Sequence, residues 1–87
     1  MMNSYERSDI IHIMKMNRMS LEEKDTVQMN FVGEVKGRRY RVMILTVEGI
    51  PTVSIKENTK MIYSETLRSV DDLKIFLEER MYQHLEG

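Results

Sequence analysis

Two short turn signals determine how the middle of this chain pairs with itself. Lys36-Gly37 and Glu48-Gly49 each lie between runs in which apolar and polar residues alternate. Alternation with a period of two is typical of a half-buried β-strand, and a two-residue connection ending in glycine is typical of a hairpin. We therefore predict an antiparallel meander with strands at about 26–35, 38–47 and 50–57.

The two turns, taken independently, predict one consistent buried face. The first turn places Phe31 opposite Val42, and the second places Val42 opposite Ile55. The first turn also places Tyr40 opposite Gly33, where the tyrosine would cover the gap that the glycine leaves. Because a slip of one residue would move every side chain to the other face of the sheet, this register is strongly specified.

The segment before the meander carries two helix signals. Ser8 as an N-cap, with apolar residues on one side of a helical wheel after it, predicts an amphipathic helix at about 5–18. A strand is the alternative for this stretch. Further on, Ser20 and Glu23 have the spacing of a capping box and predict a short helical turn that ends before Thr26.

The segment after the meander contains one more strand signal and a well-marked helix start. Residues 60–65 predict a fourth strand whose register stays open, because either Ile62 or its two neighbours could face the core. Ser69, followed by acidic residues, predicts the N-cap of a helix at about 70–85. Together the elements predict a single α+β domain over residues 1–87, an antiparallel meander of three to four strands with a helix at each end.

No catalytic, cofactor or metal motif is recognisable in the sequence. There is no cysteine, which excludes disulfides and thiolate ligands. His12 and His84 lack the spacing of a zinc site, and the scattered glycines form no phosphate-binding loop. The paired acidic residues fall in predicted helices, where they are typical of helix starts and solvated faces. We therefore expect a protein that is not an enzyme and that binds neither a cofactor nor a metal.

Composition limits the location and the origin of the chain. The net charge of −1 argues against a general nucleic-acid coat or a polybasic membrane binder. No apolar run approaches the roughly 20 residues of a membrane span, and residues 1–20 lack the apolar core of a signal peptide. These observations favour the cytoplasm and no membrane. Nine methionines and no alanine indicate AT-rich codons, so we expect a low-GC bacterium, one of its phages or a mobile element.

The outer face of the predicted sheet carries a group of basic residues. Arg39 lies opposite Glu34, and Arg41 lies opposite Lys56 without an acidic partner. Lys36 is part of the adjacent turn. Arginines beside amide and hydroxyl side chains can contact phosphates and base edges. One alternative function is therefore a DNA- or RNA-binding domain that uses this face.

A hairpin, a strand and a helix follow one another in the stretch KGRRYRV…VEGIPTVSI…TLRSVDDLKIFLEE, at about 36–80. This half of the chain is loosely similar to three-stranded-sheet-plus-helix DNA-binding domains, such as the arm-binding domains of tyrosine integrases. The resemblance implies that Arg39, Arg41 and Lys56 would read a DNA groove from the sheet. The acidic C-terminal helix and the apolar residues on the same face depart from that pattern.

Apolar residues on this outer face lead to the preferred hypothesis. The N-terminal helix could cover them, which would give a helix–sheet–helix sandwich. This covering within the chain is slightly favoured over covering by a partner. The alternative is a protein partner or a second copy of the chain. The preferred function is a small non-enzymatic protein-binding module, for example a phage or mobile-element modulator of a host factor. The candidate interface residues are Met43, Leu45, Val47, Ile50, Ile75 and Tyr82.

Overall fold

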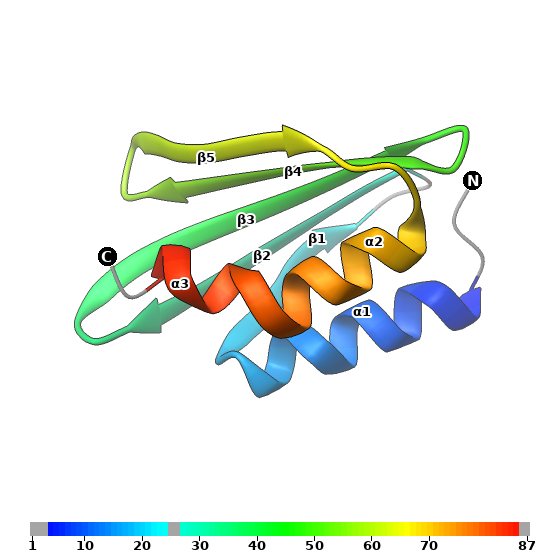
Figure 1. Ribbon diagram of the computed structural model, residues 1–87. Coiled ribbons are helices and arrows are strands. Elements are labelled where there is room, and N and C mark those ends of the chain that lie inside the picture. Colours follow the sequence, from blue (N-terminus) through cyan, green and yellow to red (C-terminus); the bar gives the residue numbers. More distant parts are fainter. Residues whose placement is uncertain (1–3, 25–26, 86–87) are drawn as a thin grey trace.

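In the described part of the chain, five β-strands form one antiparallel sheet in which every strand lies beside its neighbour in the sequence (Figure 1). The computed structural model describes residues 4–24 and 27–85 of the 87-residue chain. The predicted α+β fold is confirmed, with five strands in place of three or four. The elements are α1 (Ser4–Met16), β1 (Met19–Lys24), β2 (Gln28–Val35), β3 (Arg38–Val47), β4 (Ile50–Glu57), β5 (Lys60–Thr66), α2 (Val70–Ile75), the π-helical turn η1 (Phe76–Arg80) and α3 (Met81–Leu85).

Both predicted hairpin registers are confirmed. Val35 pairs with Arg38 at the first turn, and Val47 pairs with Ile50 at the second. The two central residues of each turn have positive φ angles, with the glycines at 80° and 78°. Positive φ at both positions is the type I′ geometry, whose twist matches that of the flanking strands. The strand predicted from residue 26 is described from Gln28 onward, and Thr26 lies outside the described residues.

The segment predicted as a second helical turn is in fact strand β1. It pairs antiparallel with β2, so Ser20 lies opposite Val32 and does not cap a helix. The Met19 side chain is buried, and Leu21 packs against the core. This inward-facing alternation was present in the sequence, but the local capping-box spacing of serine and glutamate masked it. Pairing with β2 decides the outcome, because strand formation depends on the neighbours that a segment finds.

Helix α1 also begins and ends differently from the prediction. It already includes Ser8, so that residue is not the N-cap. At its C-terminal end Asn17 Nδ2 donates a hydrogen bond of 3.0 Å to the Ile13 carbonyl. Arg18 then adopts a left-handed conformation with φ of 65°, which turns the chain into β1. A residue in the left-handed region of φ commonly ends a helix, because the following backbone N–H groups can then bond the last carbonyl oxygens of the helix.

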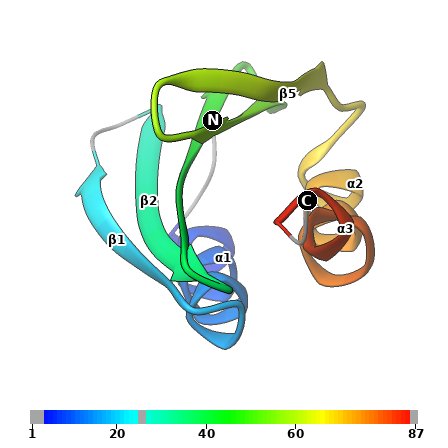
Figure 2. The same ribbon diagram turned by 90° about the vertical axis from the view of Figure 1, so that its left-hand side faces the viewer.

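Both helical segments pack on the same face of the sheet (Figures 1 and 2). α1 contributes Ile10, Ile13 and Met14 to the same buried cluster as the inner face of the sheet. The predicted helix–sheet–helix sandwich, with the N-terminal helix over the outer face, is therefore wrong. The C-terminal segment contributes Leu73, Phe76, Leu77, Met81 and Leu85 to this cluster.

Gly33 leaves room for the chain that connects α1 to β1 on the inner side. A Cβ atom on Gly33 would collide with the Arg18 carbonyl oxygen and lie 2.8 Å from Met19 Sδ. The glycine therefore lets the α1–β1 connection approach the inner face of β2. The predicted pairing of Gly33 with Tyr40 is confirmed, but the connection helps to fill the gap that had been assigned to the tyrosine alone.

The C-terminal segment starts as the sequence predicts. Ser69 is the N-cap, and its hydroxyl accepts a hydrogen bond of 3.2 Å from the Asp72 amide. Lys74 reaches across to α1, with its ammonium 3.1 Å from the Asp9 carboxylate. The two helical segments are therefore joined by an ion pair as well as by the core. Within the described residues, no helix combines the length and the apolar character needed to cross a membrane.

Candidate protein interface

The outer face of the sheet has no helix over it in the described part of the chain (Figure 2). Several of its apolar side chains lie on β3, the central strand, and Met61 of β5 is also exposed on this face. Met43 and Leu45 are partly exposed, and Val47 is 53% exposed. Ile50, opposite Val47 at the start of β4, is 49% exposed. These four residues, here called the β3 row, lie side by side at one end and in the middle of the outer face.

Polar side chains flank the β3 row, and several of them bond to each other. On the β4–β5 side the Thr52 and Thr66 hydroxyls lie 3.1 Å apart, and those of Ser54 and Ser64 lie 3.3 Å apart. On the other side Asn30, opposite Met43, is only 7% exposed. If a partner covers these hydroxyls, each pair keeps its hydrogen bond. The free-energy cost of removing water from them is therefore smaller.

The basic end of this face contains an ion pair that the sequence did not reveal. A bulge in β1 places Glu22 between the paired residues Leu21 and Glu23. The Glu22 carboxylate accepts hydrogen bonds from both terminal nitrogens of Arg41, one of them at 3.5 Å. The expectation that Arg41 lacks an acidic partner is therefore wrong. It failed because residues 20–25 had been predicted as a helical turn and not as a neighbouring strand.

Arg39 and Lys56 lie opposite the residues that the predicted hairpin registers placed there. Arg39 is exposed and lies opposite Glu34. Lys56 is exposed and lies opposite Arg41. The structure brings these three cations to one end of the outer face, while Lys36 lies in the β2–β3 turn.

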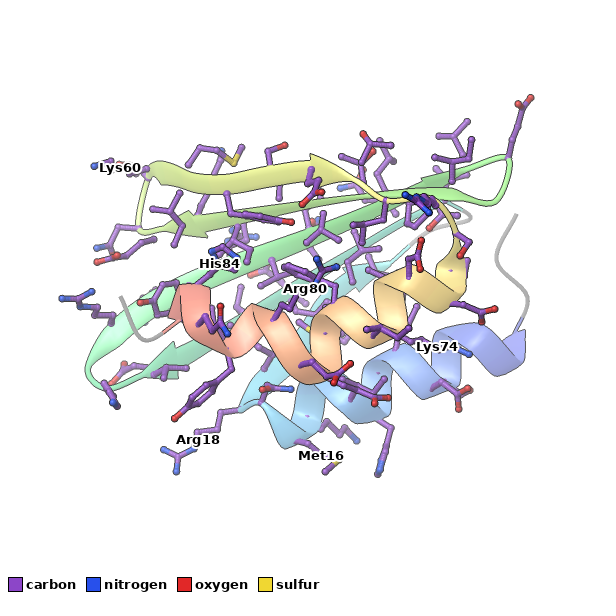
Figure 3. All side chains as sticks on the ribbon, viewed as in Figure 1. Met16, Arg18, Lys60, Lys74, Arg80 and His84 are labelled. Atoms are coloured by element: carbon purple, nitrogen blue, oxygen red, sulfur yellow. The ribbon has the colours of Figure 1, made fainter. Side chains whose placement is uncertain are left out.

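The predicted interface residues do not form one surface. Ile75 and Tyr82 belong to the C-terminal helical segment, which covers the opposite face of the sheet from the β3 row. They are 49% and 53% exposed. Tyr82 borders a hollow that also includes Met16 and Arg18, at the lower end of α1 in Figure 3. The β3 row and the helix residues are therefore two separate candidate surfaces.

A cluster of aromatic and charged side chains joins β5 to the C-terminal segment, and sequence reasoning missed it. The rings of Tyr63 and Phe76 stack with their centroids 5.1 Å apart, and the His84 ring lies 4.2 Å from Tyr63. The Arg80 guanidinium lies 5.2 Å from the centre of the Phe76 ring. Figure 3 shows Arg80 and His84 between the helix and β5. The π-helical turn begins at Phe76 and ends at Arg80, and such turns are frequent at functional sites.

Tyr63 is held in its neutral form in this cluster. Burial raises the pKa of its phenol to about 12 from 10.0, and the hydrogen bond that it donates to Glu65 and the charge of that carboxylate act in the same direction. The positive charge of Arg80 opposes the shift in pKa. The phenol therefore donates a hydrogen bond within β5, while its ring is the part that contacts Phe76 and His84 of the C-terminal segment. The sequence left the strand's register open, so it could not place Tyr63 against Phe76.

Two further observations bear on function. Among the residues that the structure describes, no three histidine, aspartate or glutamate side chains gather as metal ligands would. No family model matches the chain, and comparisons with curated proteins and with solved structures gave no match. The outer face of the sheet and the edge of β5 are the surfaces from which a function can be argued.

Proposed function

We propose that this chain is a small non-enzymatic binding protein whose outer sheet face docks onto a protein partner. The observation that carries the proposal is the exposure of the β3 row while both helical segments pack on the other face. Contiguous apolar side chains rimmed by polar ones are typical of protein interaction sites. The sequence hypothesis allowed a helix to cover this row, and the position of α1 removes that alternative.

The free energy available at this face comes from a few side chains. Burying a fully exposed aliphatic side chain contributes about 1.5–3 kcal/mol, so Val47 and Ile50, each about half exposed, would add roughly 1 kcal/mol apiece. Met43 and Leu45 lie nearer the middle of the sheet, where interface side chains are most completely dehydrated. The flexible thioether of Met43 can adapt to the shape of a partner.

The charges around the β3 row indicate the chemistry of the partner. Arg39 and Lys56 are exposed at one end of the face, and the polar residues beside the row are uncharged. A protein surface with an apolar centre and acidic residues at one side would match both features. Electrostatic complementarity of this kind sets orientation and association rate more than affinity.

Nucleic-acid binding by the same face is the second candidate function. It is supported by Arg39, Arg41 and Lys56, which lie on neighbouring strands at one end of the sheet. A phosphate contacting Arg41 would have to compete with Glu22, and the β3 row occupies the centre of the face with apolar groups. Binding of this kind would weaken steeply as salt is raised, because each phosphate contact releases counterions.

The finer part of the proposal concerns the partner's origin and location. We infer a host factor in the cytoplasm, bound by a protein of a phage or a mobile element. The support is compositional, since nine methionines and no alanine indicate AT-rich coding DNA. The GC content of the coding DNA tests the low-GC origin, and a high value would contradict that part of the inference.

Affinity purification with two matched variants tests the docking face. Leu45→Asp puts a charge in the β3 row, whereas Ile75→Asp puts the same charge on the half-exposed helix surface opposite. We expect the wild type and Ile75→Asp to retain one protein partner and Leu45→Asp to lose it, with circular dichroism confirming that all three are folded. Equal recovery with both variants would refute docking through the outer face. Co-purified nucleic acid released by salt, and lost in Arg39→Glu/Lys56→Glu, would favour the second candidate.

A further inference from the structure

Strand β5 forms one edge of the sheet, and among the described residues it pairs only with β4 (Figure 1). The Leu67 amide donates a hydrogen bond of 2.8 Å to the Pro51 carbonyl, in the same register as the pairs Thr52–Thr66 and Ser54–Ser64. Hydrogen-bonded and non-hydrogen-bonded pairs alternate along an antiparallel ladder. The peptide groups of Ser64 and Thr66 therefore point away from β4. The close approach of the paired hydroxyls agrees, because side chains lie closer in non-hydrogen-bonded pairs.

A bulge in β5 shifts the alternation of its side chains. The register changes between Ile55, which pairs with Tyr63, and Lys56, which pairs with Met61, so Ile62 is the extra residue. Met61 lies one residue after the pair Glu57–Lys60 that closes a two-residue turn, so its peptide groups also point outward.

Because of the bulge, odd- and even-numbered residues of β5 point to the same face of the sheet on either side of Ile62. Lys60 and Glu65 pair with residues of the inner rows, whereas Met61 and Ser64 pair with residues of the outer face. In a regular strand, Lys60 and Glu65 would point to opposite faces, because residues five apart have opposite parity. The extra residue at Ile62 removes this mismatch.

These features make β5 complementary to itself. If a second β5 lies antiparallel with Met61 opposite Ser64 of the other copy, the outward peptide groups of both strands face each other. In that register Lys60 lies opposite Glu65 of the other copy, on the inner face, and two-fold symmetry forms this pair twice. We propose that the protein binds a second copy of itself by antiparallel pairing of β5 with β5, in this register.

The charges of β5 favour a second copy of the same strand over other partners. An exposed lysine on an edge strand normally deters pairing with another strand. Here Glu65 of the second copy neutralises Lys60, whereas an in-register parallel arrangement would oppose lysine to lysine. The pairing extends the sheet across both copies and leaves the β3 row of each copy open, so it goes beyond the proposed docking function.

Light scattering coupled to size-exclusion chromatography tests the self-pairing over a range of concentrations. The wild type is expected to run as two 10.4 kDa chains and to dissociate on dilution. Lys60→Glu and Glu65→Lys each turn both attractive pairs into repulsive ones, which raises the dissociation constant about tenfold or more. An equimolar mixture of the two variants restores dimers, because each then supplies the charge that the other lacks. Arg39→Glu, a reversal away from this edge, leaves the dimer unchanged.

A second variant removes a donor without changing charge. Ser64→Pro deletes an amide that points away from β4, so the β4–β5 ladder remains while pairing across the edge is lost. A wild type that stays monomeric up to about 1 mM would overturn the proposal. A dimer that tolerates both charge reversals and Ser64→Pro, or that is lost only in Leu45→Asp, would also overturn it, because association would then use another surface. Loss of the protein partner in Leu45→Asp with the dimer intact would support both proposals separately.

Discussion

Glu22 of β1 and Arg41 of β3 form an ion pair over the strand that lies between them, with Val32 of β2 beneath it. The pair depends on the bulge in β1, which provides the extra residue. It fastens the edge strand to the centre of the sheet and occupies the cation that would otherwise be the best candidate for an anion contact.

Removing this ion pair should have a small effect on stability. Both side chains are more than one-third exposed, so we expect Glu22→Gln to lower the free energy of unfolding by about 0.5 kcal/mol in denaturant titrations. The same variant frees Arg41. If the outer face binds nucleic acid, Glu22→Gln should raise that affinity severalfold at low salt, and an unchanged affinity would argue against a role for Arg41.

Two tyrosine-to-phenylalanine variants should have opposite effects. The Tyr40 hydroxyl is buried and has no hydrogen-bond partner among the described residues, whereas the Tyr63 hydroxyl donates to Glu65. Removing an unsatisfied buried group relieves a penalty, so Tyr40→Phe should be neutral or stabilising by about 1 kcal/mol. Tyr63→Phe should destabilise by roughly 0.5–1.5 kcal/mol, since a hydrogen bond to a charged acceptor is lost. Thermal unfolding of the two variants beside the wild type measures both changes.

The raised pKa of Tyr63 predicts a loss of stability at alkaline pH. The pKa of its phenol is 10.0 in the unfolded chain and about 12 in the folded protein. The folded state is therefore favoured fully below pH 10, and this contribution disappears as the pH rises through the folded pKa. An ultraviolet absorbance titration should show a late tyrosine transition that is missing in Tyr63→Phe. Glu65→Gln should move this transition to lower pH, and an unchanged transition would show that the carboxylate has no influence.

Two glycine-to-alanine variants should separate steric from conformational effects. Gly33→Ala forces a methyl group against the Arg18 carbonyl and the Met19 sulfur, so the α1–β1 connection has to shift. We expect a loss of about 2–3 kcal/mol in the free energy of unfolding. Gly37→Ala meets no neighbouring atom and only adopts an unfavourable positive φ, for which about 1 kcal/mol is expected. Urea unfolding curves measure both, and equal losses would contradict the steric explanation.

The sequence predicted the central three strands because their pairing is set locally. Lys36-Gly37 and Glu48-Gly49 impose both registers, and the apolar alternation agrees with each turn. In β5 this rule fails, because the bulge lets both Ile62 and Tyr63 pack against the core while Met61 points outward. A pattern with a period of two cannot represent an inserted residue.

The sequence predicted which side chains lie on the outer face of the sheet, but not which helices or charged residues lie near them. The exposure of Val47 and Ile50 on the outer face agrees with the sequence analysis. Which face α1 covers could not be read from its own residues, since an apolar stripe fits either side of a sheet. In the structure the short connection through Arg18 passes close to Gly33 on the inner face, and such a contact between segments is not a feature of one segment.

The uninterrupted strand order has a consequence for how the chain folds. Each strand pairs with its sequence neighbour, so every hairpin closes only a short loop, and such local topologies are associated with rapid folding. The contact between Asp9 and Lys74 is different, because it joins residues 65 positions apart. Docking of the two helical segments against each other therefore carries a larger chain-closure entropy than any of the hairpins and is expected to complete the folding reaction.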